Sequence, residues 1–194
     1  MNDLNARFKP AFESGDAPRV STKMCRMLVV LSGLPASGKS TIADELGRRL
    51  RAAVLSVDPI EAAIWRCGIA PSFETGVAAY EVAVVLAEQQ LRLGLSVIAD
   101  AVNALDIARE MWRRAARLAA VPARTIEIIC SDVEEHRHRL VNRHRNIDGY
   151  PEPTWDDVIA RRAEWDEWQE DRLVLDSIEP LNDNVDRALA YIRG

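Results

Sequence analysis

One segment of the sequence has the residue types and spacing needed to bind a chain of phosphates. Its first eight residues match the pattern GxxxxGK[ST] in full, and Thr41 follows them; the segment is Gly33, Leu34, Pro35, Ala36, Ser37, Gly38, Lys39, Ser40 and Thr41. Glycines let the backbone wrap closely around an anion, and successive N–H groups at a helix N-terminus then point at it. Lys39 is expected to reach the β- and γ-phosphates of a nucleoside triphosphate, and the Ser40 hydroxyl to ligate Mg²⁺. The segment therefore predicts binding of ATP, or of a related triphosphate, together with Mg²⁺.

Two carboxylates follow other apolar runs that resemble strands. Asp58 comes directly after Ala53–Val57, and Asp100 directly after Leu95–Ala99. The carboxyl ends of parallel strands open onto one edge of a sheet, so both acids are expected to face the phosphates. Asp100 is then placed to hold the Mg²⁺ shell beside Ser40. Asp58 could accept the proton of an attacking hydroxyl group.

Both assignments have structural alternatives. Pro59 follows Asp58, and an Asp before a Pro opens many helices, so Asp58 could be an N-cap as well as a base. Asn103 lies three residues beyond Asp100. It either contacts the acceptor or the metal shell, or it caps the next helix.

A basic segment lies further along the chain. Residues 136–145 contain four arginines and three histidines and no acid. Arg139 and Arg143 are four residues apart and so share one helical face. Arginines that close over a phosphoryl group in transit stabilise its charge and expel water, and residues 146–153 could supply the hinge. The alternative is a solvated basic surface.

Composition argues against several other kinds of protein. A zinc site is not favoured, because the three closely spaced histidines, His136, His138 and His144, have no cysteine or carboxylate partner. The three cysteines are far apart in the sequence, which fits a reducing cytoplasm rather than a disulfide framework. The net charge of −5 argues against nonspecific nucleic-acid binding. No apolar run approaches the roughly 20 residues that span a bilayer, and no secretory signal is expected.

Strands and helices are expected to alternate along the chain, which predicts a doubly wound α/β domain. The expected strands are Met27–Leu31, Ala53–Val57, Leu95–Ala99, Arg124–Cys130 and Leu173–Leu175. The expected helices are Lys39–Arg51, Asp58–Trp65, Phe73–Leu93, Leu105–Ala120, Val133–Arg143, one capped by Thr154, and Asn182–Ile192. Residues 1–22 lack any sustained period and are interpreted as a mobile arm preceding one domain over 23–194.

Together these features resemble the P-loop small-molecule kinases, over approximately residues 25–193. This group includes gluconate kinase, shikimate kinase, chloramphenicol phosphotransferase, the zeta toxins and the polynucleotide 5′-hydroxyl kinases. The chain is most similar to the predicted kinases of the AAA ATPase type, although it lacks the DExx pair and arginine-finger context of AAA motors. The resemblance implies a P-loop NTPase fold. Its five-stranded parallel sheet has the order 2-3-1-4-5, with helices on both faces and a small helical lid around residues 137–155.

The resemblance also implies roles for individual residues. The acceptor-activating aspartate falls on Asp58 and the Walker-B-like acid on Asp100. The lid arginines fall on Arg139 and Arg143, with Arg145 as a further candidate. Another functional arginine falls in the helix after the third strand, among Arg109, Arg113 and Arg114. Residues 148–155 match no acceptor-binding motif.

The function expected from the sequence is transfer of the γ-phosphoryl group of ATP to a hydroxyl of a small molecule. One alternative is a polynucleotide 5′-hydroxyl kinase, with the basic segment lining a groove for the strand. Another is a nucleotide-dependent switch without an acceptor. Neither nucleic acid nor a membrane is expected as a partner, and the chain is expected to be a cytoplasmic monomer or homodimer.

Overall fold

The apolar runs of the sequence form a parallel β-sheet. The computed structural model describes residues 26–143, 145 and 147–194. Its five strands pair in the order β2-β3-β1-β4-β5, and all pairs are parallel. The strands are β1 Leu28–Ser32, β2 Ala53–Ser56, β3 Val97–Asp100, β4 Ala123–Ile129 and β5 Leu173–Asp176. This arrangement confirms the predicted fold class and strand order.

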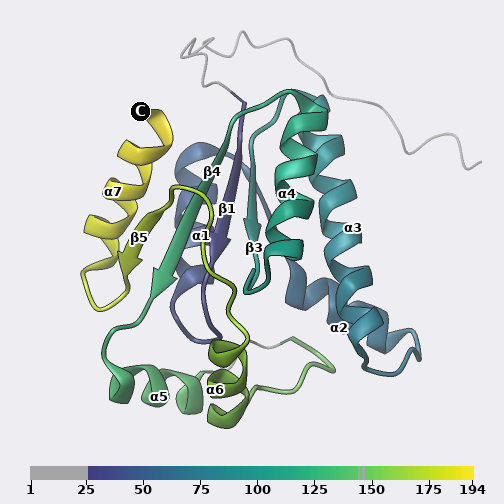
Figure 1. Cartoon of the computed structure of the whole chain (residues 1–194), viewed down its shortest axis with the longest axis vertical. Coiled ribbons are helices and arrows are strands. Elements are labelled where there is room, and N and C mark those ends of the chain that lie inside the picture. The colour runs from purple at the N-terminus through teal and green to yellow at the C-terminus, as the bar shows by residue number, and fades with distance from the viewer. Residues whose placement is uncertain (1–25, 144, 146) are drawn as a thin grey trace, which may run out of the picture.

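Helices cover both faces of the sheet. They are α1 Lys39–Leu50, α2 Val57–Arg66, α3 Phe73–Arg92, α4 Asp106–Ala119, α5 Val133–Asn142, α6 Trp155–Ala163 and α7 Leu181–Arg193. Helices α1 and α7 lie on one face, and α3 and α4 lie on the other (Figure 1). Helices α5 and α6 lie together beyond the arrowheads of the strands, at the carboxyl edge of the sheet (Figure 1). No helix among the described residues is long and apolar enough to cross a membrane.

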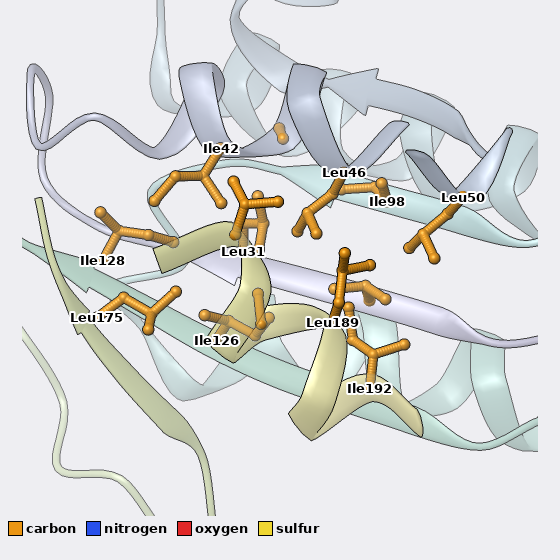
Figure 2. Packing of buried hydrophobic residues seen from close by; sticks show 14 of the residues in the cluster. Leu31, Ile42, Leu46, Leu50, Ile98, Ile126, Ile128, Leu175, Leu189 and Ile192 are labelled. Atoms are coloured by element: carbon orange, nitrogen blue, oxygen red, sulfur yellow. The ribbon is translucent and has the colours of Figure 1, made fainter. Parts of the chain in front are cut away.

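The central strand is buried on both faces, which explains its unbroken apolar sequence. Successive side chains of a strand point to opposite faces. Val29 and Leu31 accordingly join the cluster under α1 and α7, and Leu28 and Val30 join the cluster under α3 and α4. Figure 2 shows the first cluster, in which side chains of α1 and α7 meet those of the sheet. This packing fixes β1, and with it the loop that leaves its carboxyl end.

The predicted elements are all present, with boundaries shifted by no more than two residues. The prediction that Thr154 caps a helix is confirmed, because its hydroxyl accepts from the backbone N–H of Asp157 in a capping box. The predicted arm over residues 1–22 lies outside the described residues.

Candidate functional site

The loop between β1 and α1 has a backbone that needs small residues. A Cβ at Gly33 would lie 2.4 Å from the carbonyl oxygen of Ile128, so no larger residue fits there. Gly38 has a φ of 95°, in the region that favours glycine, and Ala36 has a φ of 63°. Helix α1 starts directly after Gly38, with no side-chain cap and no acid in its first turn. Its first N–H groups are therefore free to bind an anion, as the sequence predicts.

Lys39 lies in the first turn of α1, beneath this loop. Only 6% of the residue is exposed. Burial lowers the pKa of its ammonium group, and the negative charges of Asp100 and Asp58 act in the opposite direction. Asp100 ends β3, and Asp58 follows the end of the neighbouring strand β2 by two residues, so both lie at the carboxyl edge of the sheet from which α1 also starts.

Asp100 ends β3, as expected, and is 5% exposed. Its Oδ2 accepts a hydrogen bond of 2.9 Å from the hydroxyl of Ser56, which ends the neighbouring strand β2. Its Oδ1 is buried without a hydrogen-bond partner among the described residues. A buried carboxylate oxygen left free in this way is a suitable ligand for a divalent cation or for one of its water molecules. The donor set of Asp100 and Ser40 thus fits Mg²⁺, which prefers few protein ligands.

Asp58 lies in the first turn of α2. The N-cap of this helix is Ser56, so the interpretation of Asp58 as the N-cap is wrong. The Asp58 carboxylate instead forms a close ion pair with the guanidinium group of Arg145. These residues are 87 positions apart in the sequence. The predicted base is therefore held by the connection between α5 and α6.

The arginines of the basic segment have specific partners. Arg139 donates from Nε to Glu135 and from Nη1 to the hydroxyl of Ser177, over 2.7 and 2.8 Å. Arg143 donates from Nε to Glu152 over 2.8 Å, and the Nε of Arg145 lies 3.3 Å from the same carboxylate. The segment is thus not simply a solvated basic surface.

Arg143 and Arg145 would repel each other without an anion between them. The Glu152 carboxylate supplies that anion, and it also accepts from the backbone N–H of Arg145. Burial would raise the pKa of Glu152, but this N–H and the two guanidinium groups hold it below its ordinary value. Glu152 is therefore ionised at neutral pH and neutralises part of the arginine cluster.

A cavity of about 430 Å³ lies between the start of α1 and the three arginines. Its walls include the start of α1, the three arginines and the turn before α7; the residues are Ala36, Gly38, Lys39, Ser40, Thr41, Ile42, Arg139, Arg143, Arg145, Ser177, Glu179, Leu181 and Asn184. A cationic wall opposite a helix N-terminus can hold a polyanion.

A comparison with protein families bears on this site. The family described as an AAA domain matches residues 28–165, which is more than half of the 194-residue chain. The match runs from the first residue of β1 to just beyond α6 and includes the phosphate-binding loop. The chain belongs to the AAA domain family. A P-loop domain of this kind implies nucleotide binding.

Solved structures share the fold of this AAA domain. A putative kinase from Chloroflexus aurantiacus has a TM-score of 0.67 and 20% identity, covering 86% of this chain and 98% of its own. A sugar kinase from Janibacter sp. has a TM-score of 0.65 and 19% identity, covering 87% and 94%. The APS kinase of Mycobacterium tuberculosis has a TM-score of 0.68 and 17% identity, covering 88% and 99%. A comparison with curated protein sequences found no match.

Asn103 of this AAA domain has a structural role. Its side chain is fully buried, and its φ is 51°. Its amide donates to the carbonyl oxygen of Leu31 over 2.8 Å and accepts from the indole N–H of Trp112 over 2.9 Å. The N-cap of α4 is Leu105. The interpretation of Asn103 as a helix cap is therefore wrong, because its amide ties the loop after β3 to β1 and α4. Its contact with the acceptor or the metal shell stays a prediction.

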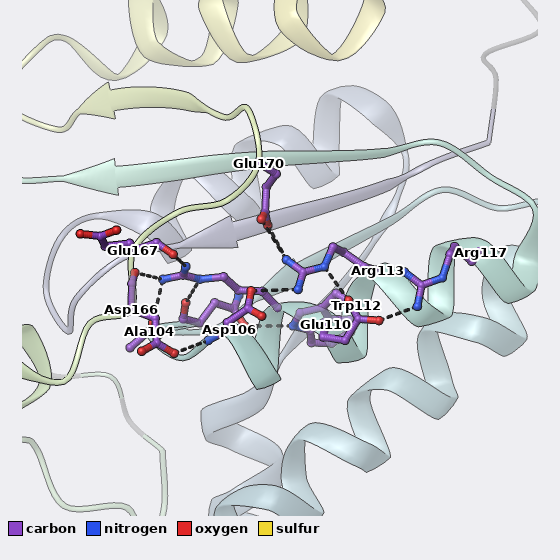
Figure 3. A network of polar contacts seen from close by, with 11 residues as sticks. Ala104, Asp106, Glu110, Trp112, Arg113, Arg117, Asp166, Glu167 and Glu170 are labelled. Carbon is purple, nitrogen blue, oxygen red and sulfur yellow. Dashed lines mark hydrogen bonds and ion pairs between the residues drawn. The ribbon is translucent and has the colours of Figure 1, made fainter.

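The three arginines of α4 that are candidates from the sequence are also engaged away from the phosphate-binding loop. Arg109 is buried, and its guanidinium group donates to the carbonyl oxygens of Asn103, Ala104, Asp166 and Glu167. It lies 3.6 Å from the ring centroid of Trp168. Figure 3 shows Arg113 between Glu170 on one side and Asp106 and Glu110 on the other. Arg114 faces Glu81. The expectation of a functional arginine in this helix is not supported by these contacts.

Replacing Arg109 by leucine should destabilise the AAA domain without a direct effect on nucleotide affinity. The change leaves four carbonyl oxygens without their buried donor and should lower the free energy of unfolding by about 3 kcal/mol. Denaturant unfolding measures the loss. Arg114→Leu is the matched control and should change it by less than about 0.5 kcal/mol, because Arg114 is exposed. Equal losses in the two variants would contradict the assigned role of Arg109.

The role of residues 148–152 is not predictable from the sequence. Tyr150 stacks on Trp65 of α2, with ring centroids 4.8 Å apart and planes inclined by 5°. Its hydroxyl donates to Glu61, one turn after Asp58, over 3.3 Å. The guanidinium group of Arg66 donates to the carbonyl oxygen of Asp148 over 2.6 Å. The segment without an assignable motif thus docks the α5–α6 connection on α2.

Proposed function

We propose that this protein is an ATP-dependent phosphotransferase that moves the γ-phosphoryl group to a hydroxyl of a small molecule. The observation that carries the proposal is the position of Asp58. A nucleotide-binding site needs Lys39, Ser40 and Asp100, but it does not need a second carboxylate near Lys39. Such a carboxylate has a clear use if a hydroxyl group must lose its proton as it attacks phosphorus.

The phosphate-binding loop and α1 would hold the nucleotide. Backbone N–H groups of residues 33–41 would surround the β-phosphate, and Lys39 would bridge the β- and γ-phosphates. Ser40 and Asp100 would hold Mg²⁺, whose charge helps neutralise the triphosphate. The nucleoside would extend along the cavity toward Leu181 and Asn184 of α7.

Binding of the nucleotide would rearrange the arginine cluster. The triphosphate competes with Glu152 and Asp58 for Arg143 and Arg145, and it carries more negative charge than either carboxylate. When Arg145 turns to the γ-phosphate, Asp58 loses its cation partner and becomes free to accept a proton. Helices α5 and α6 with their connection would act as the lid. The base would thus become available only when the nucleotide is bound.

Removal of a lid arginine should slow transfer more than it weakens ATP binding. A charge that meets the phosphoryl group in a closed site acts mostly in the transition state. Arg139→Ala and Arg143→Ala should therefore each raise the barrier by about 2–3 kcal/mol. Steady-state kinetics of each variant give kcat and the KM for ATP separately. Arg137→Ala is the control on the same helix, since the Arg137 side chain is about half exposed and Nη1 lies 3.7 Å from Glu134. Equal, small effects in all three variants would mean that no arginine lid exists.

The proposed activity can be tested by a screen for stimulated ADP release. Purified protein is incubated with MgATP and a panel of hydroxylated small molecules, and one arm contains a single-stranded oligonucleotide with a free 5′-hydroxyl. We expect one class of small molecules to raise the rate of ADP release above the rate measured without an added acceptor. Stimulation by the oligonucleotide alone would instead identify a polynucleotide kinase. A slow rate that no addition changes would identify a switch.

The likeness to solved structures supports the proposal without settling the acceptor. The three structures compared above carry the names of kinases, two of them for a sugar and for APS. Their identities of 17–20% show a shared fold. The chemistry assigned here rests on the residues of this chain.

A further inference from the structure

Helix α5 contacts the phosphate-binding loop through His136, which has no role in the proposed reaction. His136 lies in the first turn of α5, three residues before Arg139, and is 1% exposed. Asp132 fixes the start of this helix, because its Oδ1 accepts from the backbone N–H groups of Glu134 and Glu135. The sequence does not favour a zinc site of His136, His138 and His144, and His144 lies outside the described residues.

The imidazole of His136 is oriented by two contacts. Its Nε2 lies 2.8 Å from the carbonyl oxygen of Pro35, the third residue of the phosphate-binding loop. A carbonyl oxygen only accepts, so Nε2 carries the proton. The ring of Trp155, in the first turn of α6, meets the imidazole edge-on at 5.3 Å. Burial lowers the pKa of His136, so the ring is neutral at pH 7 and keeps this single donor.

The hydrogen bond acts on one particular peptide group. The carbonyl of Pro35 and the N–H of Ala36 belong to the same peptide, which is planar and trans, so the two point in opposite directions. A donor that holds the oxygen from the side of α5 therefore turns the N–H of Ala36 away from α5. Ala36 lines the nucleotide cavity. It also has a left-handed φ of 63°, a conformation that is strained for a non-glycine residue.

We propose that His136 is a positioning residue that aims the N–H of Ala36 at the phosphates of the bound nucleotide. It holds a strained peptide that would otherwise relax, and it does so from the helix that carries Arg139. The phosphate-binding loop and the lid helices α5 and α6 are thereby linked through one imidazole. The inference rests on the nucleotide binding in the proposed function, but not on phosphoryl transfer or on any acceptor.

Two substitutions separate the hydrogen bond from the packing of the ring. His136→Gln places an amide donor near the position of Nε2, and His136→Leu fills similar space without a donor. Titration calorimetry with MgADP as the probe should give a Kd about tenfold higher for the Leu variant than for the wild type. The Gln variant should stay within about threefold of the wild type. In the ¹H–¹⁵N spectrum, the Ala36 amide should shift on adding MgADP in the wild type and the Gln variant, and much less in the Leu variant.

A third variant covers the possibility that the Leu variant does not fold. His136→Asn carries the same amide on a shorter side chain, so its donor cannot reach the carbonyl of Pro35, and it should lose affinity as the Leu variant does. Wild-type affinity in the Leu or Asn variant would overturn the proposal. So would a Gln variant as weak as the Asn variant at the same melting temperature. Because the readout is MgADP affinity, a failed acceptor screen would count against the proposed transfer reaction and leave this test intact.

Discussion

Substitution of Lys39 by alanine should reduce phosphoryl transfer by about a thousandfold or more. The ammonium group is buried at the start of α1, where solvent screens it little. The Lys39 ammonium group can stabilise the negative charge that develops between the β- and γ-phosphates during transfer. Stimulated ADP release with saturating MgATP measures the loss, once an acceptor is known.

The fold of the Lys39→Ala variant should survive, because the side chain is not part of either hydrophobic cluster. Its melting temperature checks this point. Arg48→Ala is a control on the same helix, since the Arg48 side chain is 69% exposed and pairs with Glu45 alone among the described residues. Transfer by a folded Lys39→Ala variant at nearly the wild-type rate would show that the loop does not carry the catalysis.

Substitution of the two carboxylates should separate catalysis from metal binding. Asp58→Asn removes the proton acceptor and should lower kcat by about a thousandfold, within the range for a general base. Its affinity for MgATP should stay within about threefold of the wild type, or rise, because Arg145 is released for the phosphates. Calorimetry gives the affinity, and steady-state kinetics give kcat.

Asp100→Asn is the matched substitution, and unlike Asp58→Asn it should weaken the binding of MgATP. It removes the charge that would support Mg²⁺ beside Ser40, so affinity for MgATP should fall by about tenfold or more. Affinity for ATP without Mg²⁺ should change much less. If Asp58→Asn lost MgATP affinity as severely as Asp100→Asn, then Asp58 would belong to the metal shell and the assignment of a base would fail.

Local signals in the sequence were sufficient for the fold and for the phosphate-binding loop. The apolar run of β1, the glycines at 33 and 38 and the capping box at Thr154 act through near neighbours, so their types and spacing determine the local structure. Asp100 was predictable for a related reason. The end of a parallel strand has a known place at the edge of the sheet, whatever its partners are.

Contacts between distant segments were not predictable in the same way. The pairing of Arg145 with Asp58 depends on how the α5–α6 connection docks on α2. Arg109 lies in the helix where a functional arginine was expected. Its guanidinium group instead donates to the carbonyl oxygens of Asp166 and Glu167, more than 50 residues further along the chain. His136 was recognised only as a possible metal ligand, because its contact with Pro35 spans 101 residues. Such roles follow from tertiary packing, which a single sequence does not display.

The fate of the γ-phosphoryl group distinguishes a kinase from an ATPase. ATP labelled at the γ-position is supplied with the small molecule that most stimulates ADP release, and the products are separated. The label should appear on the acceptor in a one-to-one ratio with ADP. The Asp58→Asn variant should form neither product at the stimulated rate. Label recovered as free phosphate in step with ADP would show that water is the acceptor, and it would contradict the assignment of a kinase.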